Sequence, residues 1–313
     1  MSTALPFAGA TGPVDSTDWT KLIETAYDRE VSYYLREQTM FRSMIDVRPK
    51  RVAMPGDVIV LTRHKDLDVT LTPLSEVLTP DPLAVKDPDR ITINIDEYGD
   101  WGVDTLRLET FAFTQPRQEL VNLLGRHQLD KIDGLVKQVI DTGTNVLRPN
   151  ARANKDAIIA GDKLTTGVIL NSRTHLRRNL AQYKDGSNYA AFAHPDVVFD
   201  VMQDPAWLLP RNYINPNDLY NGEAGKWMSH RFVETVRAAP TANTGGVKVY
   251  PTYVFGAEAL VEVCPREFGT VIGPVQDPLN RFHPVGYLGI WGAAVYRQES
   301  LLRIETSSTY SGT

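Results

Sequence analysis

Apolar residues at helical spacing mark one long segment, residues 116–142. They recur mostly three or four positions apart, which places them on one flank of a helix, and they are Leu120, Val121, Leu124, Ile132, Leu135, Val136 and Val139. Pro116 suits the first helical position, Glu119 adds a negative charge in the first turn, and Gly143 can form a left-handed end. The pattern predicts a helix about 40 Å long at roughly 1.5 Å per residue. Because the spacing is not a sustained heptad, we do not expect a coiled coil.

Two predicted strands enclose a proline-rich stretch. Residues 57–62 form a short apolar run, and residues 90–96 alternate strictly between apolar and polar side chains. Prolines recur between them and block a sheet ladder, which favours an extended, stiffened loop. A structureless loop of this size is unusual inside a compact domain. The sequence therefore predicts a long β-arm that lies on something outside its own domain.

Shorter elements are predicted along the rest of the chain. An amphipathic helix begins near Ser16 or Thr17, and its aromatic face needs a partner surface. Residues 97–102 indicate a turn-rich bend, and residues 148–154 a domain boundary. The remaining expectations are one or two helices in 161–182, a strand at 189–193, a helix from 195, a long ordered loop at 205–227, strands at 230–236 and 248–255 around a tip at 241–246, a short helix at 256–260, and strands at 287–296 and 301–305.

Composition narrows the class of protein. The chain has 313 residues, 42% hydrophobic and 23% charged, which is ordinary for a globular protein with a real core. Its formal net charge of −5, without long charged runs, disfavours a charge-driven nucleic-acid binder. The single Cys264 cannot form an internal disulfide, which fits folding in a reducing cytoplasm. We expect neither a signal peptide nor a membrane span, because the longest nearly apolar run, 285–296, is far shorter than about 20 residues.

One segment offers a metal-like pattern. His194 is followed by Asp196, Asp200 and Asp204, so the carboxylates stand four positions apart on one predicted helix. The alternative is that His194 caps this helix and Asp196 lies in its first turn, where a negative charge is favoured. We prefer the capping interpretation.

Other candidate chemistry is weak. The glycine-containing stretches 99–102 and 286–289 do not join a strand to a helix with a following lysine, as phosphate loops do. Cys264 has no base nearby in the sequence. A basic cluster is interpreted as a solvated or subunit-facing surface and consists of Arg173, His175, Arg177 and Arg178. We therefore expect no enzyme activity, no catalytic residue, no cofactor and no metal site.

An ordered set of local motifs covers about Tyr27 to Glu305. The motifs are Asp96-Glu97-Tyr98-Gly99, the helix end from Ile132 to Asn145, Ala193-His194-Pro195-Asp196, the stretch from Asn221 to Thr235, the stretch from Tyr253 to Leu260, and Asp277-Pro278-Leu279 before Gly286-Tyr287. Together they are similar to the major capsid proteins of tailed bacteriophages, which have the Johnson or HK-ninety-seven-type fold. Residues 161–182 depart from that pattern, being shorter and more basic.

The resemblance implies an α+β capsid fold with five segments. These are an N-arm at 1–50, an extended β-hairpin E-loop with connecting strands at 51–103, a peripheral domain with the long spine helix at 104–150, an axial domain at 151–280, and returning peripheral strands with a tail at 281–313. It also implies a structural coat protein. Such a protein assembles into pentamers and hexamers of an icosahedral shell around double-stranded DNA, which it encloses without sequence-specific binding.

Partners and contacts follow from the same resemblance. We expect location in the virion capsid and, during assembly, in the host cytoplasm, with a portal and an optional decoration protein as partners. A separate scaffolding protein is expected because no long N-terminal helical extension is present. The residues expected at assembly interfaces are Lys65, Lys86, Trp19, Tyr27, Tyr34, Arg48 and Arg51. Some members cross-link a lysine to a neighbour's asparagine with a glutamate assisting, but the sequence indicates no partner for such a bond.

Two alternatives remain open at this point. An encapsulin-like cellular compartment shares the fold and would be distinguished by a cargo enzyme. A cytosolic metal-dependent hydrolase using His194 would be a small oligomer, whereas a coat protein forms a particle of very large mass.

Overall fold

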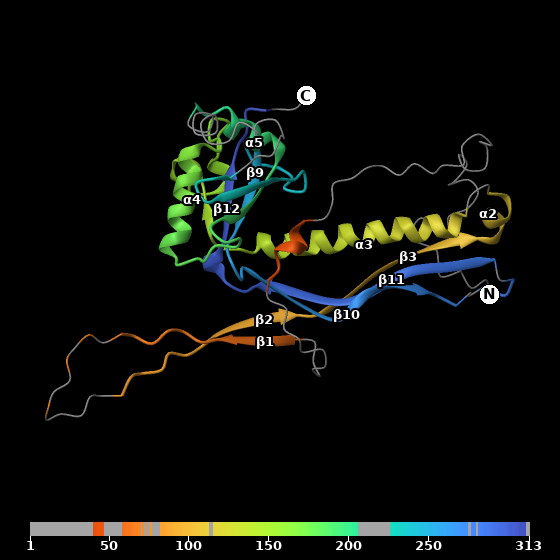
Figure 1. The fold of residues 1–313 in the computed structure, drawn as a ribbon. Helices are drawn as coiled ribbons and strands as arrows, with labels where there is room; N and C mark the ends of the chain where they lie inside the picture. The colour runs from red at the N-terminus through yellow and green to blue at the C-terminus, as the bar shows by residue number, and fades with distance from the viewer. Residues whose placement is uncertain are drawn as a thin grey trace.

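A computed structural model describes residues 40–46, 58–69, 71, 73, 76, 82–112, 115–205, 226–274, 277–279 and 281–310. A domain built on a large sheet, a long helix lying along a smaller sheet, and a projecting hairpin make up the described chain (Figure 1). Several predictions lie outside the described residues. These are the helix from Ser16 or Thr17, most of the loop at 205–227, and Trp19, Tyr27, Tyr34, Arg48 and Arg51.

The predicted long helix is confirmed as α3 (Pro116–Asp141), with proline in its first turn. Its carboxyl-terminal half is buried through Ile132, Val136 and Ile140. Gly143 does not adopt the left-handed conformation that we predicted, since it is not among the described residues with positive φ. It is needed for space instead, because a Cβ there would lie 2.8 Å from Leu301. Within the described residues, no helix is long and apolar enough to cross a membrane.

A three-stranded antiparallel sheet lies against α3. Its order is β10 (Leu260–Ile272), β11 (Phe282–Val295) and β3 (Asp96–Thr105). The bend predicted at 97–102 is wrong, because these residues form the middle of β3. Glycine serves close packing there, since a Cβ on Gly99 would lie 2.6 Å from the carbonyl oxygen of Tyr287. The short helix predicted at 256–260 is also wrong, because the chain turns and enters β10.

The larger sheet has seven strands in the order β4-β12-β9-β5-β7-β6, with β8 beside β9. Their bounds are β4 (Val146–Leu147), β5 (Tyr189–Ala193), β6 (Lys226–Trp227), β7 (His230–Glu234), β8 (Thr241–Ala242), β9 (Lys248–Phe255) and β12 (Leu301–Thr306). The pairs β5–β7 and β4–β12 are parallel, and the other pairs are antiparallel. The strands predicted at 189–193, 230–236, 248–255 and 301–305 are confirmed.

Both faces of this sheet are covered. On one face pack α4 (Thr166–Arg178) and α5 (Pro195–Met202), with side chains such as Ile169 and Val197 that have no exposed surface. The other face packs against α3 and the 3-10 helix η1 (Phe41–Met44), with Tyr253 at the centre. The region 161–182 thus contains one helix rather than two. Short 3-10 turns complete the connections as η2 (Pro149–Ala151), η3 (Lys155–Ala157) and η5 (Gln298–Ser300).

The projecting hairpin consists of β1 (Val58–Arg63) and β2 (Asp89–Asn94), as predicted. The strands are antiparallel, with Val58 opposite Asn94 and Arg63 opposite Asp89. The helix α2 (Leu106–Phe111) follows β3 and leads toward α3; its Thr105 cap accepts a hydrogen bond from the amide of Leu108.

A buried histidine lies in the core of the larger domain. His230 has no exposed surface, and its two ring nitrogens lie 3.0 Å from Ser172 Oγ and 3.0 Å from the carbonyl oxygen of Met228. Burial lowers the pKa of His230 to about 4. The neutral imidazole is therefore the form that fits the folded chain.

Because His230 is buried in its neutral form, we expect the folded chain to lose stability in acid. The pKa of His230 is about 6.5 in an unfolded chain and about 4 in the folded chain. Its contribution to the free energy of unfolding is therefore fully present above about pH 6.5 and is lost as the pH falls through 4. Between pH 7.5 and 4.5, we expect the free energy of unfolding of the wild type to fall by about 2 kcal/mol more than that of His230→Asn. Urea titrations of both proteins at the two pH values measure this difference, and parallel pH dependences would contradict it.

Candidate assembly surfaces

The hairpin is attached to the body through a small apolar cluster. Ile59 and Ile93 are cross-strand neighbours and pack against Val261 and Val263 of β10. Next to this cluster, β11 approaches β2 so closely that a Cβ on Gly292 would lie 2.2 Å from the carbonyl oxygen of Asn94. The base of the hairpin therefore rests on the backbone of β11, where only glycine fits.

Charged side chains pair at the end of the β1–β2 hairpin where Arg63 lies opposite Asp89. Arg63 donates hydrogen bonds to Asp89 at 3.2 Å and to Glu299 of η5 at 3.3 Å. Lys65, predicted at an assembly interface, pairs with Asp89 at 2.8 Å. Hydrogen bonds from Lys65 and Arg63 lower the pKa of Asp89. Lys65 thus lies at the base of the hairpin and is partnered within its own chain, with 46% of its side chain exposed.

Beyond this base the hairpin carries exposed apolar side chains. Lys86, the second predicted lysine, pairs with Asp68 at 2.6 Å across the extended segments. Large hydrophobic residues around it are exposed, up to 90% for Leu71, and include Leu67, Val69, Leu83 and Val85. Figure 1 shows this segment pointing away from the rest of the chain. The described part of the chain's body therefore does not cover these side chains.

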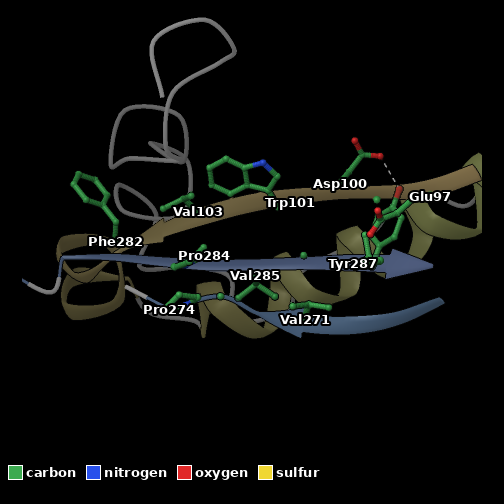
Figure 2. Close-up of a pocket in the computed structure, with 14 residues that line it drawn as sticks. Glu97, Asp100, Trp101, Val103, Val271, Pro274, Phe282, Pro284, Val285 and Tyr287 are labelled. Atoms are coloured by element: carbon green, nitrogen blue, oxygen red, sulfur yellow. Dashed lines mark hydrogen bonds between the residues drawn. The ribbon is translucent and has the colours of Figure 1, made fainter. Parts of the chain in front are cut away.

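A groove lies along the three-stranded sheet and is lined by residues of β3, β10 and β11 (Figure 2). Its volume is about 590 Å³, and its lining is mainly apolar, including Trp101, Val103, Val271, Pro274, Phe282 and Pro284. Trp101 is 58% exposed although it lies in the middle of a strand. Sequence reasoning missed this groove because it assigned the glycines around Trp101 to a bend.

The same sheet is joined to α3 by a polar network, and two of its members, Asp100 and Tyr287, also line the groove. Asp100 accepts hydrogen bonds from Lys131 at 2.5 Å and from the Tyr287 hydroxyl at 2.8 Å, and His127 Nδ1 lies 2.8 Å from that hydroxyl. Burial opposes the charged form of Asp100, but these hydrogen bonds outweigh it and lower the pKa of its carboxyl group. The network therefore joins the helix to the sheet through side-chain hydrogen bonds.

The carboxylates of the metal-like pattern at His194 do not converge on one point in the structure. The ring Nδ1 of His194 accepts a hydrogen bond from the Asp196 amide at 3.2 Å, which confirms that it caps α5. Asp196, Asp200 and Asp204 instead accept hydrogen bonds from separate hydroxyl groups, those of Tyr250, Thr309 and Thr166 respectively. Each carboxylate is thus occupied by a structural partner.

The other candidates also have structural surroundings. Burial raises the pKa of the Cys264 thiol to about 11, which disfavours the reactive thiolate. In the basic cluster, the guanidinium of Arg177 lies 5.0 Å from the ring centre of Tyr183, and Arg178 is exposed at the end of α4. Neither feature points to catalysis.

Comparison with solved structures identifies the fold. The capsid of Ralstonia phage GP4 aligns with a TM-score of 0.73 at 13% identity, covering 92% of this chain and 96% of that chain. The capsid of cyanophage P-SCSP1u gives 0.71 at 14%, covering 93% and 94%. The acidic stable capsid of Helicobacter pylori bacteriophage KHP30 gives 0.68 at 11%, covering 96% and 99%. Models of known families and curated protein sequences give no match.

The chain therefore has the α+β fold of phage capsid proteins, as the resemblance in its sequence predicted. These alignments cover more than nine tenths of this chain and of each solved chain, so the likeness extends over most of its length.

The contact between Gly292 and Asn94 generates a test of how the hairpin is attached. A methyl group in Gly292→Ala must displace β2, so we expect the amides of β1 and β2 to exchange hydrogen faster while α4 and α5 keep their protection. Hydrogen exchange followed by mass spectrometry measures this. Gly269→Ala in β10 is the control, because a Cβ there meets nothing within 4 Å. Equal exchange of the hairpin in both variants would show that it is not seated on β11.

Proposed function

We propose that the chain is the major capsid protein of a tailed bacteriophage. Subunits associate into pentamers and hexamers of an icosahedral shell that encloses double-stranded DNA. The observation that carries this proposal is the hairpin, whose extended segments expose Leu71, Val85 and neighbouring apolar side chains to solvent. Ordering an extended segment costs conformational entropy, and burying these side chains against other copies of the chain compensates for it. The fold shared with phage capsids supports the same conclusion.

The positions of the two apolar surfaces favour ring formation. The hairpin projects from one end of the molecule, and β3 and β11, which form the groove, extend toward the other (Figure 1). A contact between unlike surfaces of identical subunits is heterologous, and it closes into a ring when the rotation between subunits allows. The hairpin of one copy packing near Trp101 of the next would give such a contact. Slight differences in hairpin angle would then accommodate five or six copies.

Many modest contacts would stabilise the shell. A standard interface buries roughly 1,600 Å², and a hairpin draped over a neighbour adds to the area between the subunit bodies. Because each subunit is held at several places at once, the shell is more stable than any single contact. The net charge of −5 fits a container, since a strongly basic wall would retain the phosphates of DNA.

The finer assignments form part of the same proposal. The five segments are the N-arm at 1–50, the E-loop at 51–103, the peripheral domain at 104–150, the axial domain at 151–280, and the returning strands and tail at 281–313. Lys65 and Lys86 are assigned to contacts between subunits, together with the five N-terminal interface residues named above. A separate scaffolding protein, a portal, and assembly in the host cytoplasm complete the proposal.

Removal of the exposed part of the hairpin tests its role. Replacing residues 66–86 by Asn-Gly would close the hairpin with a two-residue turn just beyond the Arg63–Asp89 pair. We expect a soluble, folded subunit that forms no shells. Light scattering and negative-stain electron microscopy, beside wild-type particles, measure assembly, and circular dichroism reports the fold. Normal particles from the shortened chain would exclude the hairpin as an assembly element, and a wild-type chain that stays monomeric at high concentration would refute the proposed function.

The groove is tested by a single substitution. Trp101→Ser removes the largest exposed side chain of the groove, so we expect the concentration needed for assembly to rise at least about tenfold. Because Trp101 is 58% exposed in the subunit, the thermal stability of the monomer should change little. Leu180→Ser is the control, since Leu180 is 87% exposed but lies in the domain of the larger sheet. Equal assembly by both variants would remove the groove from the proposed interface.

A further inference from the structure

Three potential metal ligands meet at the end of the three-stranded sheet. Asp104 lies near the end of β3 and is paired in register with His283 of β11, and Glu109 comes from the following helix α2. Their ligand atoms all lie within 4.8 Å of one another. This is the one group of three or more such residues in the part of the chain that the structure describes. The sequence predicts no metal site here because Asp104 and Glu109 are far from His283 along the chain.

Asp104 lacks a compensating partner. It is 1% exposed, and neither of its carboxylate oxygens accepts a hydrogen bond from a fixed donor; the group close enough to share a proton with it is the carboxyl group of Glu109. His283 Nδ1 is also buried without a hydrogen bond, and it lies 3.5 Å from Glu109 Oε2. Arg117, in the first turn of α3, is close enough to influence Asp104 electrostatically but donates no hydrogen bond to it. Burying a carboxylate in this way is costly unless a cation or a proton neutralises it.

The distance between two of the three ligands is that of a small transition-metal site. Ligands at roughly 2.0–2.2 Å from a tetrahedral zinc ion stand roughly 3.3–3.6 Å from one another, and the 3.5 Å between His283 and Glu109 already matches this edge. An imidazole beside two carboxylates suits Zn²⁺ or Mn²⁺ better than Ca²⁺ or Mg²⁺, which prefer oxygen ligands alone. Three protein ligands leave a fourth position for water. Glu109, with 27% of its side chain exposed, provides access from solvent.

We propose that Asp104, Glu109 and His283 bind one divalent transition-metal ion, Zn²⁺ in the first place, which ties α2 to the end of the three-stranded sheet. The ion supplies the positive charge that balances the buried carboxylate. It also joins β3, α2 and β11, because each of these elements contributes one ligand. A proton is the competing occupant, because burial and the neighbouring Glu109 raise the pKa of Asp104 to about 7. A proton and a metal ion therefore compete for the same carboxyl group.

The test uses the untagged full-length chain at pH 8 after removal of metal with EDTA. Titration with ZnCl₂, followed by calorimetry and elemental analysis, should give one bound ion per chain and a higher unfolding temperature. Asp104→Asn and His283→Gln should each weaken zinc binding at least about tenfold. His127→Gln is the matched control and should bind like the wild type. His127 Nδ1 lies 3.7 Å from Asp100 Oδ2, but that oxygen is already paired with the ammonium group of Lys131 at 2.5 Å.

Glu109→Gln provides a second variant if a substitution at Asp104 prevents folding, because Glu109 is more exposed and circular dichroism can verify the fold. It should also weaken binding. A wild-type chain that takes up no zinc, or variants that bind with unchanged affinity and stoichiometry, would overturn the proposal. These outcomes are independent of shell formation, which electron microscopy reports separately.

Discussion

Burial of the carboxyl-terminal half of α3 is the constraint on which the rest of the structure depends. Val136 and Ile140 have no exposed surface and share a core with one face of the larger sheet. The Tyr253 hydroxyl donates a hydrogen bond to Asp141 at 2.7 Å, and the amide of Phe41 donates one to Asp133 at 2.8 Å. The other half of the helix therefore projects in a fixed direction and supports the three-stranded sheet, so one apolar flank sets the geometry of the whole molecule.

Elements with a strong local period were predictable from the sequence. The helix α3 and the strand β2 follow regular patterns of apolar residues, and β5 and β9 are short runs rich in apolar residues. At all four the local signal agrees with the tertiary fold. The two errors have different causes: at β3, glycines were interpreted as turn residues, whereas residues 256–260 were interpreted as a helix and form a turn before β10. In the structure Gly99 instead admits the neighbouring strand. Such close approaches depend on residues distant in the sequence, which a local pattern does not contain.

Among the candidate sites, too, some were predictable from the sequence and others were not. The projecting hairpin was predictable because prolines and a length unsuited to a compact domain are local features. The groove was not, since it needs β3, β10 and β11 side by side. The cluster at Asp104 was also not predictable, because His283 lies opposite Asp104 only through the register of β3 and β11. The order of weak motifs along the chain nevertheless predicted the capsid fold that comparison with solved structures supports.

Strand β11 connects the two sheets mechanically. It pairs with β3 on one side and with β10 on the other, and the chain then passes through η5 into β12 of the larger sheet. Hydrogen bonds between antiparallel strands run across the strand direction, so a pull along β11 loads many of them together in shear instead of peeling them one at a time. Tension applied at the outer end of the small sheet is thereby carried to the larger domain through a continuous backbone, with little stretching of the molecule.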